Sequence, residues 1–265
     1  MLVPVRTSGS KPPLFLVHDQ HGIMPFGTGV ARVLGSDHPV YAIHASGMDG
    51  RQPATNNLPS MVQTYIAEIH GARLMGPLLI GGLGSGSLAA IEIARELQDR
   101  GRRVGPVILV DPPPLGGQLQ QSPTPDLPAP TIGGPLYQSL RMALVDHASH
   151  PGNDLPFEAG NPKQLHLATL AGLAALTAFA RCAPQPFAGP TELLLPAERA
   201  EQFFHPKMSW HELLPGERIV HVLPWDHGEL LKSGLAATID AVKFLVEEAV
   251  EAFADRPPET AAAAG

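Results

Sequence analysis

Short apolar runs alternate with segments of helical spacing along most of the chain. The runs are rich in Leu, Ile and Val and end at loops, which is typical of strands buried on both faces of a parallel sheet. They occupy residues 13–18, 39–44, 77–82, 106–111, 191–196 and 218–224. Apolar residues at helical spacing lie between them, as in 58–74, and follow the last run in 228–253. The alternation predicts an α/β fold with a mostly parallel central sheet flanked by helices.

The alternation stops after residue 111 and resumes at residue 191. Between them, a proline-rich stretch precedes two helical candidates, at 134–148 and 162–182. Since ligands bind at the carboxyl edge of such sheets, we expect residues 112–188 to form a helical lid over that edge. The alternative is a second packing layer without a functional role.

The rest of the domain organisation follows from length and composition. A chain of 265 residues with 44% hydrophobic residues suits one domain, which we place at residues 13–255. The polar, proline-bearing residues 1–12 read as a linker, and the alanine-rich residues 256–265 read as a disordered tail.

Charge and composition exclude several classes of partner. The formal net charge of −7 argues against nucleic acid, which requires clustered Lys and Arg. The sequence has neither a polybasic tract nor an apolar run of membrane-spanning length, so we expect no membrane partner. The single cysteine, Cys182, and an N-terminus without an apolar signal segment indicate a cytoplasmic location.

Residues 77–90, PLLIGGLGSGSLAA, read as a strand, a glycine-rich turn and the start of a helix. This is the setting of a nucleophile elbow, whose pattern is Gly-x-Ser-x-Gly. Here the pattern is Gly82-x-Gly84-x-Gly86, so glycine occupies the nucleophile position. A register shift to Ser85 fits less well, because an elbow needs small residues two before and two after its nucleophile. Ser87 would already lie in the helix.

The same stretch partly imitates a dinucleotide-binding loop. The fingerprint G-x-G-x-x-G requires glycine at position 87, where this chain has serine. Nucleotide binding therefore remains only a remote alternative. No His/Cys/Asp group has zinc spacing, and His18 with His21 are too few to indicate a metal site.

Together these segments resemble the thioesterase domains of non-ribosomal peptide and polyketide synthases, which have the α/β-hydrolase fold. The resemblance runs from about residue 2 to residue 250. It is carried by LVPVRTSGSKPPLFLVH, PVYAIHASGMDG, IGGLGSGSLAAIEIAREL, VILVDPP and HVLPWDHGELL.

The resemblance implies the roles of individual residues. His227, in PWDHGELL, matches the catalytic histidine, and Asp111, at the end of VILVD, matches the aspartate that orients it. Asp226 is a weaker candidate for that aspartate. The backbone N–H groups of Ser85 and Gln20 match the oxyanion hole, although Asp19, Gln20 and His21 are more polar than the family usually has in this loop.

The resemblance also implies a function. Such a domain releases an acyl or peptidyl chain, by hydrolysis or macrocyclisation, from the phosphopantetheine arm of a carrier protein, and binds no cofactor of its own. Gly84 has no atom that can form an acyl-enzyme. It is either an engineered replacement of serine or a native residue. If it is native, His227 and Asp111 form a dyad that acts as a general base for hydrolysis, elimination or ring closure of a carrier-bound chain, or the domain only binds such chains.

Overall fold

The computed structural model describes residues 1–115, 131–150, 153–200, 203 and 210–255. Its seven-stranded sheet has the order β1-β3-β2-β4-β5-β6-β7, and all neighbouring strands are parallel except β1 and β3. The strands are β1 Leu2–Arg6, β2 Leu14–Val17, β3 Val40–Ile43, β4 Leu79–Leu83, β5 Val107–Val110, β6 Thr191–Pro196 and β7 Arg218–Leu223. The expected α/β-hydrolase fold, with a mostly parallel sheet, is confirmed.

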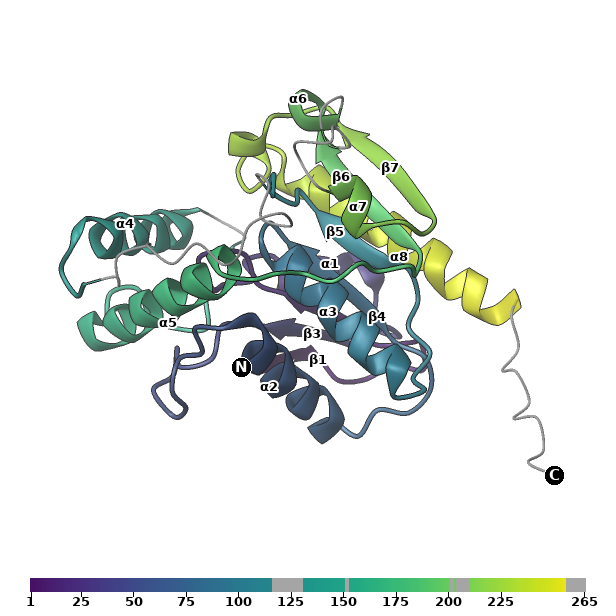
Figure 1. Ribbon diagram of the computed structural model, residues 1–265, viewed down its shortest axis with the longest axis horizontal. Helices are drawn as coiled ribbons and strands as arrows, with labels where there is room; N and C mark the ends of the chain where they lie inside the picture. The colour runs from purple at the N-terminus through teal and green to yellow at the C-terminus, as the bar shows by residue number, and fades with distance from the viewer. Residues whose placement is uncertain (116–130, 151–152, 201–202, 204–209, 256–265) are drawn as a thin grey trace.

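Helices cover both faces of this sheet (Figure 1). They are α1 Gly27–Leu34, α2 Leu58–Gly71, α3 Gly86–Asp99, α4 Pro135–Ser149, α5 Pro162–Ala180, α6 Ala197–Ala200, α7 Trp210–Leu213 and α8 Leu235–Asp255, with a 3₁₀ turn, η2, at His227–Glu229. None of the helices in the described ranges combines the length and apolarity that crossing a bilayer requires.

Alternate residues of each central strand enter two separate cores. Phe15 and Val17 of β2 pack in the core with α2 and α3, whereas Leu14 and Leu16 pack in the core with α1 and α8. All four side chains are at most 1% exposed. Because both faces of β2 are buried, its sequence is a continuous apolar run.

The predicted linker over residues 1–12 is wrong at its start. Leu2–Arg6 forms β1, which pairs antiparallel with β3 at the edge of the sheet. Pro4 is tolerated because an edge strand can leave its outward positions without ladder hydrogen bonds. The sequence pattern did not predict this strand, because a proline within a short polar segment is typical of a loop.

The C-terminal helix also begins later than the predicted residue 228. The chain forms η2 first, and α8 starts only at Leu235. Gly234 lies against the Trp225 ring so closely that a β-carbon there would be 2.7 Å from it. This contact and the turn around Glu229 separate the two helical segments.

The segment between β5 and β6 contains α4 and α5, which lie side by side beyond the end of the sheet (Figure 1). Residues 116–130 of the predicted lid, and the predicted tail at 256–265, lie outside the described residues. The observed helices are close to the predicted 134–148 and 162–182. Their role as a lid stays a prediction.

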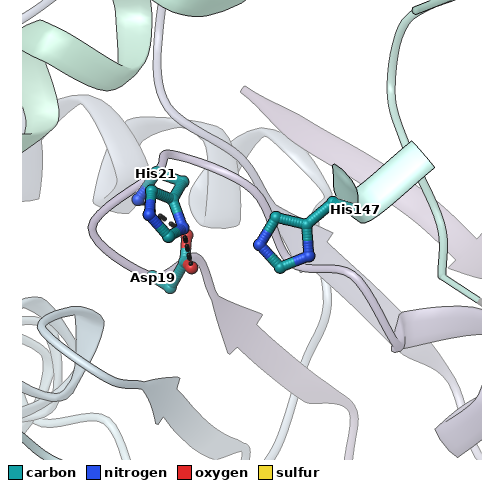
Figure 2. A group of neighbouring side chains, drawn as sticks. All are labelled: Asp19, His21 and His147. Carbon is teal, nitrogen blue, oxygen red and sulfur yellow. Dashed lines mark hydrogen bonds and ion pairs between the residues drawn. The ribbon is translucent and has the colours of Figure 1, made fainter. Parts of the chain in front are cut away.

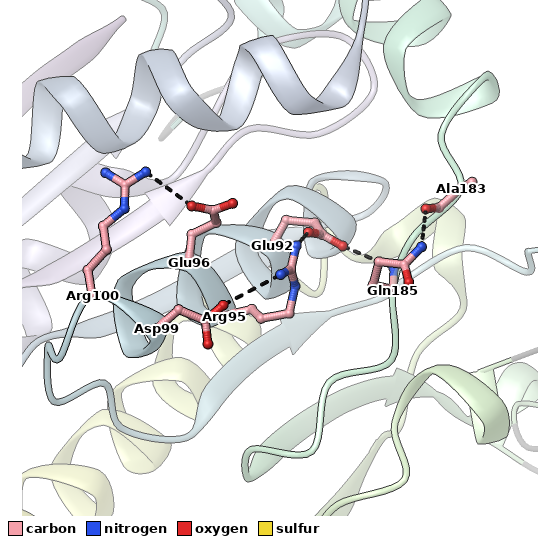
Figure 3. A network of polar contacts seen from close by, with 7 residues as sticks. All are labelled: Glu92, Arg95, Glu96, Asp99, Arg100, Ala183 and Gln185. Carbon is pink, nitrogen blue, oxygen red and sulfur yellow. Dashed lines mark hydrogen bonds and ion pairs between the residues drawn. The ribbon is translucent and has the colours of Figure 1, made fainter.

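A polar network fixes the return from α5 to the sheet (Figure 3). Glu92 of α3 is 8% exposed and accepts a hydrogen bond from the Gln185 backbone N–H at 3.1 Å. The same carboxylate pairs with Arg95, whose guanidinium also reaches Asp99 at 3.6 Å. The connection after α5 is therefore tied to the helix that follows the elbow.

Candidate active site

The turn between β4 and α3 has the geometry of a nucleophile elbow. Gly84 has φ +54°, and its N–H donates to the Val110 carbonyl at 2.8 Å. A β-carbon on Gly82 would lie 2.6 Å from the Gly86 carbonyl oxygen, and one on Gly86 would lie 1.8 Å from that of His18. Glycine is therefore required two positions before and two positions after residue 84, as the elbow pattern predicts.

The two serines that follow occupy different environments. Ser87 is fully buried, and its Oγ donates to the Gly82 carbonyl at 3.3 Å, so it is not accessible to a substrate. Ser85 has ordinary helical geometry, with φ −62° and ψ −21°. The left-handed backbone conformation belongs to Gly84, which supports position 84 as the elbow residue.

His227 and Asp111 meet at the carboxyl edge of the sheet. His227 Nδ1 is hydrogen-bonded to Asp111 Oδ2, although the two residues are 116 positions apart in the sequence. Asp111 is only 3% exposed and has φ +48°, whereas the His227 side chain is 51% exposed. A strained, buried carboxylate that orients a more accessible imidazole is the arrangement of an acid–base dyad.

Two neighbouring residues that the sequence did not single out hold this dyad. Arg199 of α6 is 2.6 Å from the second Asp111 oxygen, Oδ1. Glu198 accepts a hydrogen bond from the His227 backbone N–H at 3.0 Å. Asp226, the weaker candidate from the sequence, is exposed and makes no side-chain capping bond to η2. Asp111 therefore fills the position beside the histidine.

The loop after β2 faces the elbow. Gln20 Oε1 lies 2.9 Å from the point where a β-carbon on residue 84 would be, and Asp19 Cβ lies 3.7 Å from the same point. Asp19 Oδ1 accepts the His21 N–H at 2.8 Å, which shapes the loop. The oxyanion roles of the Gln20 and Ser85 N–H groups stay predictions.

Asp19, His21 and His147 form a compact group (Figure 2), and all three line a cavity together with the elbow residue Gly84. His21 Nδ1 is 2.8 Å from Asp19 Oδ2, and His147 faces the loop from α4, its ring centre 5.4 Å from that of His21. Although burial opposes charge on both partners, their attraction lowers the pKa of Asp19 and raises that of His21. Burial lowers the pKa of His147.

The residues of the elbow and the dyad line the same cavity as this group of three, and its volume is about 170 Å³. The lining includes Asp19, Gln20, His21, Gly84, Asp111, His147 and His227. A larger cavity, of about 500 Å³, lies between α2, α3 and the end of α5, where Cys182 and Glu92 line it. We place the candidate active site in the smaller cavity because it contains the elbow and the dyad.

The sequence anticipated part of this cavity. It predicted the positions of Gly84, Asp111 and His227, which the fold brings together from the ends of three different strands. It did not predict His147, which comes from a helix of the insertion, or Arg199. No spacing rule links such residues to the elbow, since their approach depends on how the insertion folds back.

The chain is similar to short stretches of much longer synthetases. The dimodular nonribosomal peptide synthase of Bacillus subtilis (strain 168) is 33% identical over 111 residues, which are 42% of this chain and 5% of that protein. The atromentin synthetase greA of Suillus grevillei is 28% identical over 155 residues, 58% of this chain and 15% of that protein. The chain therefore matches only a small part of the length of these relatives.

Solved structures share the fold. The NocB thioesterase domain from the nocardicin cluster aligns with a TM-score of 0.64 and 20% identity, over 93% of this chain and 98% of that one. The Vlm2 thioesterase domain with genetically encoded 2,3-diaminopropionic acid and a bound dodecadepsipeptide aligns with a TM-score of 0.66 and 21% identity, over 94% and 97% of the two chains. The family model described as "Thioesterase domain" matches residues 12–244, and the chain therefore belongs to the thioesterase domain family.

Proposed function

We propose that this domain accepts an acyl or peptidyl thioester from the phosphopantetheine arm of a carrier protein and releases the chain. His227 acts as the general base, and Asp111 orients its ring. The observation that carries the proposal is the His227–Asp111 hydrogen bond in the same cavity as the Gly84 elbow. Because Asp111 occupies Nδ1, proton transfer falls to His227 Nε2.

Gly84 determines how the release proceeds. Since glycine cannot form an acyl-enzyme, the thioester carbonyl is attacked directly by water or by a nucleophile of the bound chain. His227 takes the proton of the attacking group, the C–S bond breaks, and the proton passes to the leaving phosphopantetheine thiolate. Attack by water gives hydrolysis, and attack by the chain's own amine or hydroxyl gives cyclisation.

The relatives support the carrier-bound substrate. The names of the matched proteins describe a nonribosomal peptide synthase and an atromentin synthetase, and the Vlm2 thioesterase domain was solved with a bound depsipeptide. We infer that the partner of this domain is a peptidyl or acyl carrier protein. The family membership argues against the dinucleotide-binding alternative.

Turnover of a carrier-bound acyl thioester tests this function, with intact-mass measurement of the domain in parallel. His227→Ala should reduce the rate by roughly 100-fold or more, the usual contribution of a positioned general base. His70→Ala, at an exposed position on α2, is the matched control and should keep the native rate. Equal rates for the native protein and His227→Ala would refute the base assignment.

A second candidate is a domain that binds carrier-loaded chains without turnover, and the glycine at position 84 favours it. In that case the native protein should bind the loaded carrier and leave its thioester intact. Binding measured by resonance shifts in the carrier, together with an unchanged thioester, would replace the catalytic proposal with this one. If the protein neither binds the loaded carrier nor turns over its thioester, the catalytic proposal and the binding proposal are both refuted.

A further inference from the structure

The group of Asp19, His21 and His147 offers three metal-binding atoms within 4.8 Å of one another. We propose that these residues form a binding site for a divalent transition metal, with Zn²⁺ as the best match, directly beside the elbow glycine. Two imidazoles and one carboxylate are a common ligand set for catalytic zinc, which keeps a further coordination position open for water.

The carboxylate of the group is already held in place. Asp19 is 3% exposed, and its Oδ1 accepts the backbone N–H groups of His21 at 2.8 Å and Ile23 at 3.4 Å. These bonds fix the carboxyl group and leave Oδ2 as the donor atom toward the histidines. Hydrogen bonds of this kind to a ligand's second oxygen orient it and strengthen metal binding.

The two histidines approach from different parts of the fold. His21 lies on the same loop as Asp19, with its Nδ1 2.8 Å from Asp19 Oδ2. His147 lies in the last turn of α4, and its ring is directed toward that loop (Figure 2). A metal ion would replace the proton shared by His21 and Asp19, and a small inward movement of α4 would complete the set.

The location of the site gives the ion a chemical role. Asp19 Cβ lies 3.7 Å from the point where a β-carbon on residue 84 would be. Asp19 and Gly84 both line the cavity that also contains His227. A bound metal would therefore lie next to the nucleophile position that Gly84 occupies. Zinc lowers the pKa of bound water to about 7, which generates a nucleophile without a side-chain hydroxyl.

This role deepens the proposed function and rests on it, whereas metal binding itself does not. Water loses a proton to His227, and the resulting hydroxide attacks the thioester carbonyl carbon. The C–S bond breaks, and His227 returns the proton to the thiolate. The products are a carboxylic acid and a free thiol, with no change in oxidation state.

Metal titration tests the site independently of catalysis. The full chain is freed of metal on a chelating resin and titrated with Zn²⁺ by calorimetry and with Co²⁺ by visible absorption. We expect one ion per chain and the absorption of a low-coordinate cobalt site. His147→Ala and His21→Ala should each weaken binding by more than the ~10–100-fold that the loss of a ligand's hydrogen-bond partner costs.

His150→Ala is the matched control. His150 follows α4 directly and bonds to the Asp146 carbonyl, but it is outside the group of three. This control should keep the native affinity, and circular dichroism establishes that each variant is folded. The absence of binding at one equivalent, or an equal affinity for the native protein, His147→Ala and His21→Ala, would overturn the site.

Thioester turnover tests the catalytic role. Removing the metal should abolish most of the hydrolysis, and Zn²⁺ should restore it in the native protein and in His150→Ala but not in His147→Ala. If metal binds as expected and turnover does not depend on it, the catalytic role is refuted and the binding site stands. If the protein binds metal but has no thioesterase activity under any condition, the proposed function is what fails.

Discussion

At the scale of single residues, the elbow contains two glycines that close packing requires and a third, Gly84, that it does not require. Gly82 and Gly86 lie against backbone atoms that cannot move aside. At Gly84, within the described part of the chain, an added β-carbon would come closer than 3.0 Å only to Gln20 Oε1, at the end of a flexible side chain. Space therefore permits a side chain at position 84, and φ +54° is the remaining cost.

Gly84→Ser should consequently fold, with a loss of about 1 kcal/mol in unfolding free energy from the left-handed backbone. If the glycine replaces a parental serine, this variant should form an acyl-enzyme detectable by intact mass, and addition of His227→Ala should prevent it. Gly86→Ala, whose β-carbon would lie 1.8 Å from the His18 carbonyl oxygen, should be strongly destabilised by comparison. A folded Gly84→Ser without an acyl-enzyme would favour the non-nucleophilic dyad.

Arg199 is a second residue-scale feature, because it pairs with the Asp111 carboxylate of the dyad. Its guanidinium is the ion-pair partner of Asp111 Oδ1, and the carboxylate is 3% exposed. Arg199→Met should lower the unfolding free energy by about 2 kcal/mol, because a buried charge loses a charged hydrogen-bond donor. Urea denaturation measures this loss.

The control for this prediction is Arg51→Met. Arg51 also pairs with an aspartate, Asp49, at 3.7 Å, but its side chain is 87% exposed. Exposed pairs contribute little, so this variant should change the unfolding free energy by less than about 1 kcal/mol. Equal effects of the two substitutions would contradict the importance assigned to the Arg199–Asp111 pair.

At the scale of elements, α5 connects the insertion with the loop that faces the elbow. Gly172 of α5 approaches this loop so closely that a β-carbon would lie 2.6 Å from the His21 carbonyl oxygen and 2.8 Å from Leu140 Cδ2 of α4. The helices α4 and α5 and the loop after β2 therefore meet at Gly172. A change in α5 should be transmitted to both sides of the cavity.

Gly172→Ala tests this contact. Overpacking of this kind costs about 1–3 kcal/mol, which exceeds the ~1 kcal/mol that alanine gains over glycine in a helix. The thermal midpoint should fall, and thioester turnover should fall with it because the loop is displaced. Gly160→Ala, where an added β-carbon meets none of the described residues within 4 Å, should leave both unchanged. A Gly172→Ala variant as stable and active as the native protein would show that the contact is not required.

At the scale of the whole molecule, the parts predictable from sequence are those set by local patterns. The predicted runs at 13–18, 77–82 and 106–111 are almost continuously apolar, so their place in a parallel sheet buried on both faces follows directly from the sequence. The elbow is equally local, since its glycines are two residues apart. The order of these elements along the chain predicted the fold, and the fold brings Asp111 and His227 to one edge.

Features that depend on distant contacts could not be predicted in this way. β1 forms only because β3 offers it an edge, and its proline reads as a loop signal when taken alone. His147 reaches Asp19 because α4 folds back over the carboxyl edge of the sheet, across 128 positions of sequence that carry no common pattern. The candidate metal ligands were therefore visible only in three dimensions.

The buried histidines make the stability of the whole molecule dependent on pH. His44 is 3% exposed at the end of β3, and its Nδ1 accepts the Met24 N–H at 3.2 Å, which requires an unprotonated nitrogen. Burial, with a smaller contribution from His18, lowers the pKa of His44 to about 3. The unfolded chain takes up a proton at about pH 6.5 that the native state refuses, so stability falls as the pH drops from 6.5 toward 3.

The loss from His44 alone should be about 2 kcal/mol between pH 7 and pH 5, since the unfolded form gains the free energy of protonation over that interval and the native form does not. Urea unfolding at the two pH values measures it. In His44→Asn, whose side-chain oxygen can still accept the Met24 N–H, the difference between the two pH values should shrink by this amount, whatever the variant's absolute stability. The matched variant His70→Asn, at an exposed position, should keep the native difference. If His44→Asn retains it as well, acid sensitivity arises elsewhere, and the neutral, buried state assigned to His44 is wrong.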